Sequence, residues 1–148
     1  MAESVYKLAI VAGDELELRL VVDQSGTITD GAVRGIGGPE MLTLLQAWKN
    51  RWHGSLKALC VPSGRSGPEL MLKELILKAQ GQWQYPYGED ELCHCRAVPT
   101  EVVDRAILLG AHTPELVSRW TSASTACGTC RKDVTNILQY RLESKKSA

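Results

Sequence analysis

The feature that most constrains this chain is a set of four cysteines in its last third, arranged as two close pairs. Cys93 and Cys95 are separated by one residue, and Cys127 and Cys130 by two. The stretch between the pairs is long enough for a pair of helices. Four thiolates brought together in this way bind either a 2Fe-2S cluster or a tetrahedral zinc ion. We therefore interpret the four cysteines as metal ligands.

The spacing favours the iron-sulfur cluster over zinc. Zinc sites more often have two residues between the cysteines at both ends, whereas the first pair here has one. A histidine replaces a cysteine at one iron of Rieske centres, so His94 is a further candidate ligand. Because four cysteines are already present, we interpret His94 as a neighbour of the site. Zinc stays open as the alternative.

The composition argues against nucleic-acid and membrane binding. Lysine plus arginine equals aspartate plus glutamate at 17 each, so there is no overall positive charge to attract nucleic acid. We recognise neither a secretory signal nor an apolar run of about 18 residues, and we expect no membrane segment. We therefore expect a cytoplasmic protein, in which reduced cysteines favour metal binding over disulfides.

Hydrophobic periodicity predicts an α+β fold for the first part of the chain. Apolar residues alternate with charged ones from residue 15 to 22, the period-two pattern of a strand with one buried face. With the apolar run at 5–11 and the segment 27–36, this predicts a three-stranded antiparallel sheet. Apolar spacings of three and four residues then predict two helices, one over 39–52 and one that ends near residue 80.

The rest of the chain predicts a small all-helical module. We expect helices over 99–110, from 114 to 122 and from about 131 to 142, with Thr113 as the cap of the second. Each cysteine pair is then expected directly before a helix, where amide groups and the helix dipole stabilise thiolate charge. An acidic run marks the boundary, which gives domains 1–88 and 89–148.

The cysteine segment closely resembles the 2Fe-2S module of bacterioferritin-associated ferredoxins, which is also the central domain of NifU-type proteins. The runs 93–96, 111–113 and 124–130 carry the resemblance, which covers about residues 92–142. In that family all four cysteines bind the cluster. The resemblance therefore implies four cluster ligands here: Cys93, Cys95, Cys127 and Cys130.

Residues 1–88 are similar to the U-type iron-sulfur assembly scaffold, which precedes this module in NifU-type proteins. The similarity is carried by Gly13-Asp14, by the turn at 23–26 and by the glycines at 37 and 38 before a helix. That family builds transient clusters on three cysteines and an aspartate. The resemblance implies the same kind of α+β domain for this part of the chain.

The scaffold's ligand set is incomplete in this sequence. Asp14 matches the aspartate and Cys60 matches the third cysteine, but Ala12 and Gly38 stand at the other two positions. Cys60 is also explained as a small core residue, and Asp14 as a turn residue. One thiolate and one carboxylate are too few to build a cluster. We therefore expect a degenerate scaffold-like domain that serves for docking.

These patterns predict a 2Fe-2S protein for electron transfer or for support of iron-sulfur or iron metabolism. We find no set of residues for substrate turnover and expect no enzyme. The expected partner is a redox protein, an iron-sulfur protein or an iron-storage protein. Two alternatives stay open. One is a NifU-like scaffold or carrier that passes its cluster to other proteins, and the other is a zinc-stabilised interaction module.

Overall fold

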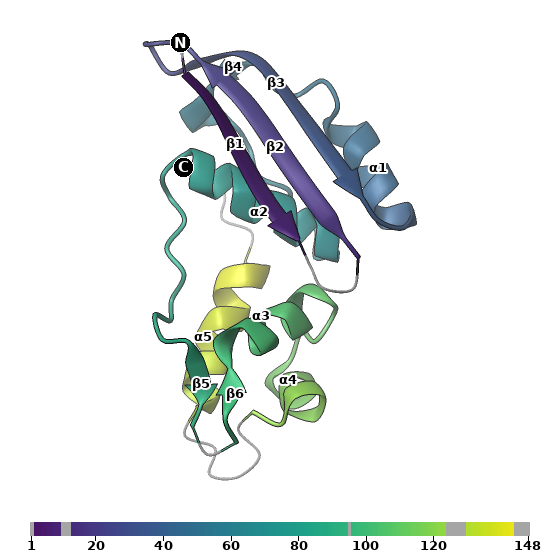
Figure 1. Ribbon diagram of the computed structural model, residues 1–148, viewed down its shortest axis with the longest axis vertical. Coiled ribbons are helices and arrows are strands. Elements are labelled where there is room, and N and C mark those ends of the chain that lie inside the picture. The colour runs from purple at the N-terminus through teal and green to yellow at the C-terminus, as the bar shows by residue number, and fades with distance from the viewer. Residues whose placement is uncertain (1, 10–12, 95, 124–129, 144–148) are drawn as a thin grey trace. The chain divides into compact units, whose positions relative to one another are not determined.

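The computed structural model describes residues 2–9, 13–94, 96–123 and 130–143. The chain divides into two compact units, whose elements are labelled in Figure 1. Unit 1 consists mainly of residues 1–64 and 68–83, and unit 2 of residues 65–67 and 84–145. The connector after Trp83 thus groups with the cysteine-containing unit.

Unit 1 is built on a four-stranded antiparallel sheet in the order β1-β2-β3-β4. The first three strands form the predicted meander: β1 (Ala2–Ala9), β2 (Glu15–Val22) and β3 (Thr27–Ile36). The fourth, β4 (Gly54–Ser55), pairs with the start of β3. The sequence did not reveal β4, because two residues are too few to show an alternating pattern.

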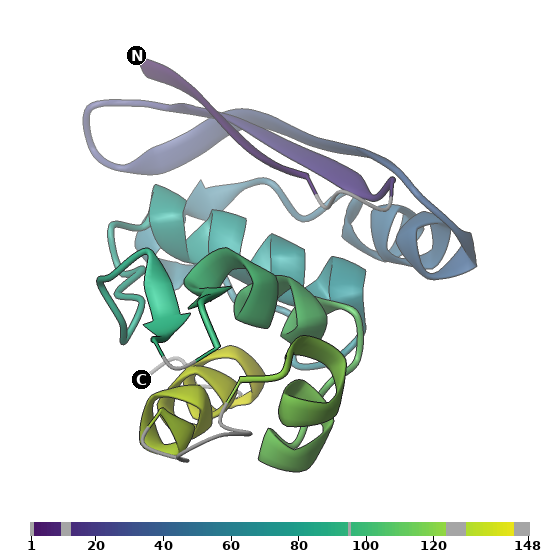
Figure 2. The ribbon, with the colours of Figure 1, turned by 60° about the horizontal axis from the view of Figure 1, so that its bottom comes forward.

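Helices cover one face of this sheet, as Figure 2 shows for α1 (Pro39–Trp48) and α2 (Gly67–Ala79). Leu16, Leu18 and Leu20 of β2 are at most 1% exposed, so the apolar set of the alternation is the buried one. α1 ends earlier than predicted, and a 3-10 helix (Leu56–Ala58) precedes α2.

The turn between β2 and β3 is held by Asp23. Its Oδ1 atom accepts the hydroxyl of Ser25 at 2.6 Å and the backbone N–H groups of Ser25 and Thr27 at 2.9 and 3.0 Å. The Ser25 hydroxyl first, and then Thr27, lower the pKa of Asp23, because these bonds favour the charged carboxylate. Gly26 completes the turn with a φ of +86°, which suits a residue without Cβ.

The described residues of unit 2 form three helices and a short hairpin. The helices are α3 (Thr100–Leu108), α4 (Pro114–Thr121) and α5 (Arg131–Leu142), and the hairpin pairs β5 (Glu91–Cys93) with β6 (Val98–Pro99). The prediction of an all-helical module was therefore wrong. Strands of three and two residues show no periodicity, so the sequence pattern could not separate them from a loop.

The described helices of unit 2 are short, and α4 begins at its predicted cap. The side-chain oxygen of Thr113 accepts the backbone N–H of Leu116 at 3.2 Å, and Pro114 occupies the first turn of α4. The longest helix of the described chain is α2, with 13 residues. Within the described residues no helix combines the length and apolar character that a bilayer crossing demands.

Candidate metal centre

The first cysteine pair begins in the β5–β6 hairpin. Cys93 is the last residue of β5, pairs with Val98 of β6 and is 2% exposed. Ala97, just before β6, has a φ of +53°, in the left-handed region that residues with a Cβ seldom adopt. Cys95 lies outside the described residues. The prediction that this pair stands directly before a helix was wrong, because β6 lies between Cys93 and α3.

The second cysteine pair leads into α5. Cys130 is the N-cap of this helix, and its carbonyl oxygen accepts the backbone N–H of Val134 at 3.0 Å. The first amide groups of a helix have no partner within it and carry a partial positive charge. Cys130 therefore lies at the positive end of α5, a location that stabilises a thiolate. Cys127 lies outside the described residues.

The two described cysteines of unit 2 belong to one buried apolar cluster. Cys93 is 2% exposed and Cys130 6% exposed, and residues of β5, β6 and all three helices of unit 2 complete this cluster. The end of β5 and the start of α5, which are far apart in the sequence, thus each contribute a thiol to the same core. Among the described residues no three histidine, cysteine or acidic side chains form a metal-binding group, and Cys95 and Cys127 are not among those residues.

Tyr87 packs against the cysteine-containing cluster from the connector. Its hydroxyl donates to the carbonyl oxygen of Glu91 at 2.9 Å and to the carboxylate of Glu89 at 3.1 Å. Burial raises the pKa of Tyr87, and the negative charges of Glu89, Asp133 and Cys130 raise it further. The hydroxyl thus ties the connector to the first residue of β5.

His94 faces two carboxylates. Its Nδ1 lies 2.8 Å from an Oε1 of Glu91, and its Nε2 lies 3.5 Å from an Oε2 of Glu89. The bond to Glu91 raises the pKa of His94, against a smaller opposite effect of burial. Both ring nitrogens thus have acidic neighbours, and the side chain is 67% exposed. This geometry fits the interpretation of His94 as a neighbour of the site rather than a ligand.

A buried ion pair joins α3 and α5. Arg141, 3% exposed, donates to both carboxylate oxygens of Asp104 at 2.8 and 2.6 Å, and Tyr85 donates to the same carboxylate at 3.0 Å. Sequence reasoning missed this group of residues. Its signal was the spacing of α5, because Arg141 follows Ile137 and Leu138 at the helical interval that buries them.

A second ion pair fixes the start of α5. Arg131, the residue after Cys130, pairs with Glu115 in the first turn of α4. The pKa of Glu115 is lowered by its own backbone N–H first and by Arg131 next, since both favour the carboxylate. Both side chains are about half exposed, so the pair orients the helices more than it stabilises them.

Unit 1 separates the two residues that resemble scaffold ligands. Asp14 lies beside Gly37, where a Cβ would come within 2.8 Å of its Oδ1, just before α1 begins. The interpretation of Cys60 as a small core residue was wrong, because Cys60 is exposed. It lines an open pocket of about 320 Å³ with Trp48, the last residue of α1. Asp14 and Cys60 therefore lie toward opposite ends of α1. Ala12 lies outside the described residues.

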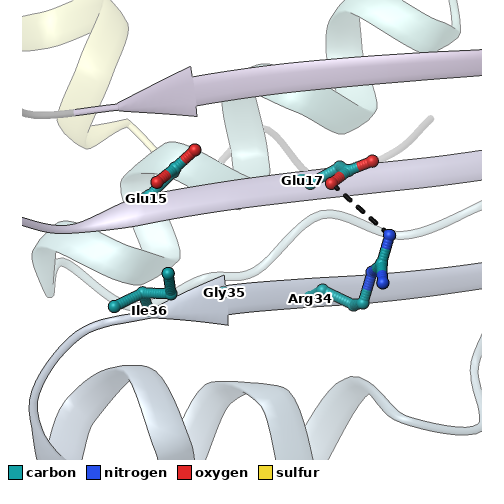
Figure 3. A pocket seen from close by; sticks show the side chains of 5 residues that line it. All are labelled: Glu15, Glu17, Arg34, Gly35 and Ile36. Carbon is teal, nitrogen blue, oxygen red and sulfur yellow. Dashed lines mark ion pairs between the residues drawn. The ribbon is translucent and has the colours of Figure 1, made fainter.

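A further pocket of unit 1 lies on β2 and β3 and has a volume of about 390 Å³. Figure 3 shows its lining, with Glu15 and Glu17 from β2 and with Arg34 and Ile36 from β3. The Arg34 guanidinium lies 3.8 Å from the Glu17 carboxylate. This pocket offers carboxylates and one paired cation but no thiolate, so it does not compete as a site for an iron-sulfur cluster.

Comparison with known families identifies what unit 2 is similar to. Residues 92–140 match the family described as BFD-like 2Fe-2S binding domain. The matched range runs from β5 almost to the end of α5 and contains all four cysteines. Searches of the curated proteins and of the solved structures found no significant match. The cofactor that this family match supports is a 2Fe-2S cluster.

The described residues fit such a cluster. Soft thiolates are the donors that iron-sulfur clusters take from proteins, and Cys93 and Cys130 supply two of them from one apolar core. The family match does not extend to residues 1–91, so the scaffold resemblance of that part stays a prediction.

Proposed function

We propose that this chain carries single electrons on a 2Fe-2S cluster, in support of iron-sulfur or iron metabolism. One observation carries the proposal. Cys93 and Cys130 lie near the two ends of the sequence segment that matches a 2Fe-2S-binding family, and both side chains belong to the same buried core. When bound, the cluster supplies reversible one-electron chemistry. The partner we propose is a redox protein or an iron-storage protein, and we propose no substrate turnover.

In this proposal the chain holds the cluster with four thiolates. In the sequence Cys93 and Cys95 stand before α3, and Cys127 and Cys130 stand between α4 and α5. Apolar neighbours keep water from Cys93 and Cys130, and the positive end of α5 offsets part of the negative charge. Exposed Lys132 adds positive charge in the first turn of α5, which favours the reduced cluster.

The frame around the two cysteines favours a cluster that is retained rather than passed on. The Arg141–Asp104 pair joins α5 to α3, and the Arg131–Glu115 pair joins it to α4. Supporting contacts of this kind hold ligand-bearing elements in one geometry. A fixed geometry suits electron transfer, in which the ligands should move little, and it opposes release to another protein.

Reversible reduction is the test of this proposal. Anaerobically purified chain should show cysteine-to-iron absorption bands that bleach on reduction and return on reoxidation, with one electron taken up per chain. The cluster should also stay in place when an apo-acceptor protein is added. Transfer to the acceptor faster than loss to a chelator would instead support the carrier alternative. A colourless protein that contains zinc would support the interaction module.

A matched pair of cysteine variants makes the test specific. Cys130→Ser should abolish the absorption bands, because it removes a proposed ligand. Cys60→Ser removes the exposed cysteine of unit 1 and should leave the spectrum and the reduction unchanged. Loss of the bands in Cys60→Ser, with retention in Cys130→Ser, would reject the proposed ligand set.

A further inference from the structure

β1 leaves one edge of the unit 1 sheet open. It is the outermost strand in the order β1-β2-β3-β4, as Figure 1 shows, and all eight of its residues pair with β2 on one side. In the described part of the chain no strand pairs with its other side. β1 contains neither a proline nor a bulge, which commonly block such an edge, and its charged residues Glu3 and Lys7 disfavour strands whose charges do not match them. An edge of this length is a template for another strand.

The outward side chains of β1 carry opposite charges at equal distances from Val5. Glu3, Val5 and Lys7 are all exposed and alternate with less exposed residues, so they share the outward face of the strand. Val5, at the centre, is one of the exposed large apolar residues of the chain, at 46%. A negative charge stands two residues before it and a positive charge two residues after it.

This arrangement of charges is complementary to a second, antiparallel copy of the same strand. If two β1 strands pair antiparallel about Val5, each Glu3 stands directly opposite Lys7 of the other copy. The two Val5 side chains then face one another between the two ion pairs. Directly opposite residues of an antiparallel pair point to the same face, so all three contacts form together. On the other face Ser4 stands opposite Tyr6.

The contacts within the chain leave these charges available. Glu3 lies 3.8 Å from Arg19, its side chain is 55% exposed, and Arg19 also lies 3.7 Å from Asp30. Lys7 stands opposite Glu17 in the register with β2, and that carboxylate lies 3.8 Å from Arg34, as Figure 3 shows. Both contacts are long and exposed, and such ion pairs contribute little.

We propose that two copies of this chain pair through β1, antiparallel about Val5, to form one continuous sheet across a two-fold axis. The axis runs perpendicular to the sheet, so the helix-covered faces of both copies lie on the same side. Such an interface is isologous, because the same strand contributes to both sides. Main-chain hydrogen bonds supply most of the affinity, and the charges set the register.

Sedimentation equilibrium of the full chain tests this dimer through its charges. Glu3→Lys places like charges opposite one another twice and should weaken dimerisation by at least about tenfold. Lys7→Glu should weaken dimerisation equally, because it places two negative charges opposite one another twice. Mixing the two variants should restore a dimer, now a heterodimer, because position 3 of each copy again faces an opposite charge at position 7 of the other. The double variant Glu3→Lys/Lys7→Glu should dimerise like the original chain.

Asp30→Lys is the matched control. Asp30 lies on β3, away from the open edge, and contacts the same Arg19 that Glu3 contacts. Its substitution reverses the same sign of charge within the same sheet and should leave dimerisation unchanged. A chain that stays monomeric at high concentration would overturn the proposal. So would a dimer that ignores Glu3→Lys, or one that Asp30→Lys weakens equally.

Discussion

Unit 1 and unit 2 differ in the side chains that build their cores. Unit 1 buries the leucine face of β2 under helices, and its one cysteine, Cys60, is exposed. Unit 2 has helices of 8 to 12 residues and a two-stranded hairpin, and its core includes Cys93 and Cys130. In unit 2 two of the four candidate ligands, Cys93 and Cys130, are themselves core residues. The folding of unit 2 should therefore be coupled to cluster binding, whereas unit 1 should fold whether or not the cluster is bound.

The largest expected effect is the unfolding of unit 2 when its cluster cannot bind. Cys130→Ser should remove metal-binding energy, which is on the order of 10 kcal/mol where a small domain folds around its site. Amide hydrogen exchange should then become fast over α3 to α5 and stay slow over β2 and β3. Protected amides throughout α3 and α5 in the cluster-free variant would contradict the comparison between the units.

A core substitution in unit 1 should destabilise that unit and leave unit 2 unchanged. Leu18→Ala removes a fully buried side chain of β2 and should lower the free energy of unfolding of unit 1 by about 2–5 kcal/mol. The visible spectrum of unit 2 should not change. Leu42, 59% exposed in α1, provides the control, because Leu42→Ala should cost less than about 0.5 kcal/mol. Bleaching of the spectrum by Leu18→Ala would show that the units are not independent.

The buried ion pair of unit 2 should have an effect of intermediate size. Arg141→Met leaves the Asp104 carboxylate without its bidentate partner, which should cost about 3 kcal/mol in the cluster-bound protein, as chemical denaturation would measure. Arg105→Met breaks the exposed pair with Glu101 on α3 and should cost less than about 1 kcal/mol. Equal costs for both variants would mean that the buried pair does not hold the helices together.

The smallest expected effect is a pH dependence in unit 1. The lowered pKa of Asp23 contributes stability that is present above its unfolded value of about 3.9 and is lost as the pH falls through the lower folded value. Asp23→Asn should therefore flatten the fall in the unfolding free energy of unit 1 below about pH 4. An unchanged acid slope in the variant would remove Asp23 from this account.

Much of unit 1 was predictable because its pattern is long. The alternation over β2 and the helical spacing after Pro39 each extend over several residues, so the meander and α1 follow from periodicity. β4 and the β5–β6 hairpin are too short to show a period. Pairing with neighbouring segments creates them, and that information is not local. The domain limits 1–88 and 89–148 and the cytoplasmic location stay predictions.

The sequence predicted the cofactor of the candidate site better than it predicted the residues that surround the site. The cysteine spacing indicated a cluster, which the family match supports, and the structure brings Cys93 and Cys130 into one core. The assignment of all four cysteines as ligands stays a prediction. The Arg141–Asp104 pair could not be read from the residue types alone, because charged residues are buried only where the fold supplies their partner.

The most direct test of the central claim is an analysis of iron, zinc and acid-labile sulfide in the anaerobically purified chain. We predict about two iron atoms and two sulfides per chain, the composition of a 2Fe-2S cluster. The same values are expected for Cys60→Ser, and both elements should be lost in Cys93→Ser. One zinc ion per chain without sulfide would contradict the account.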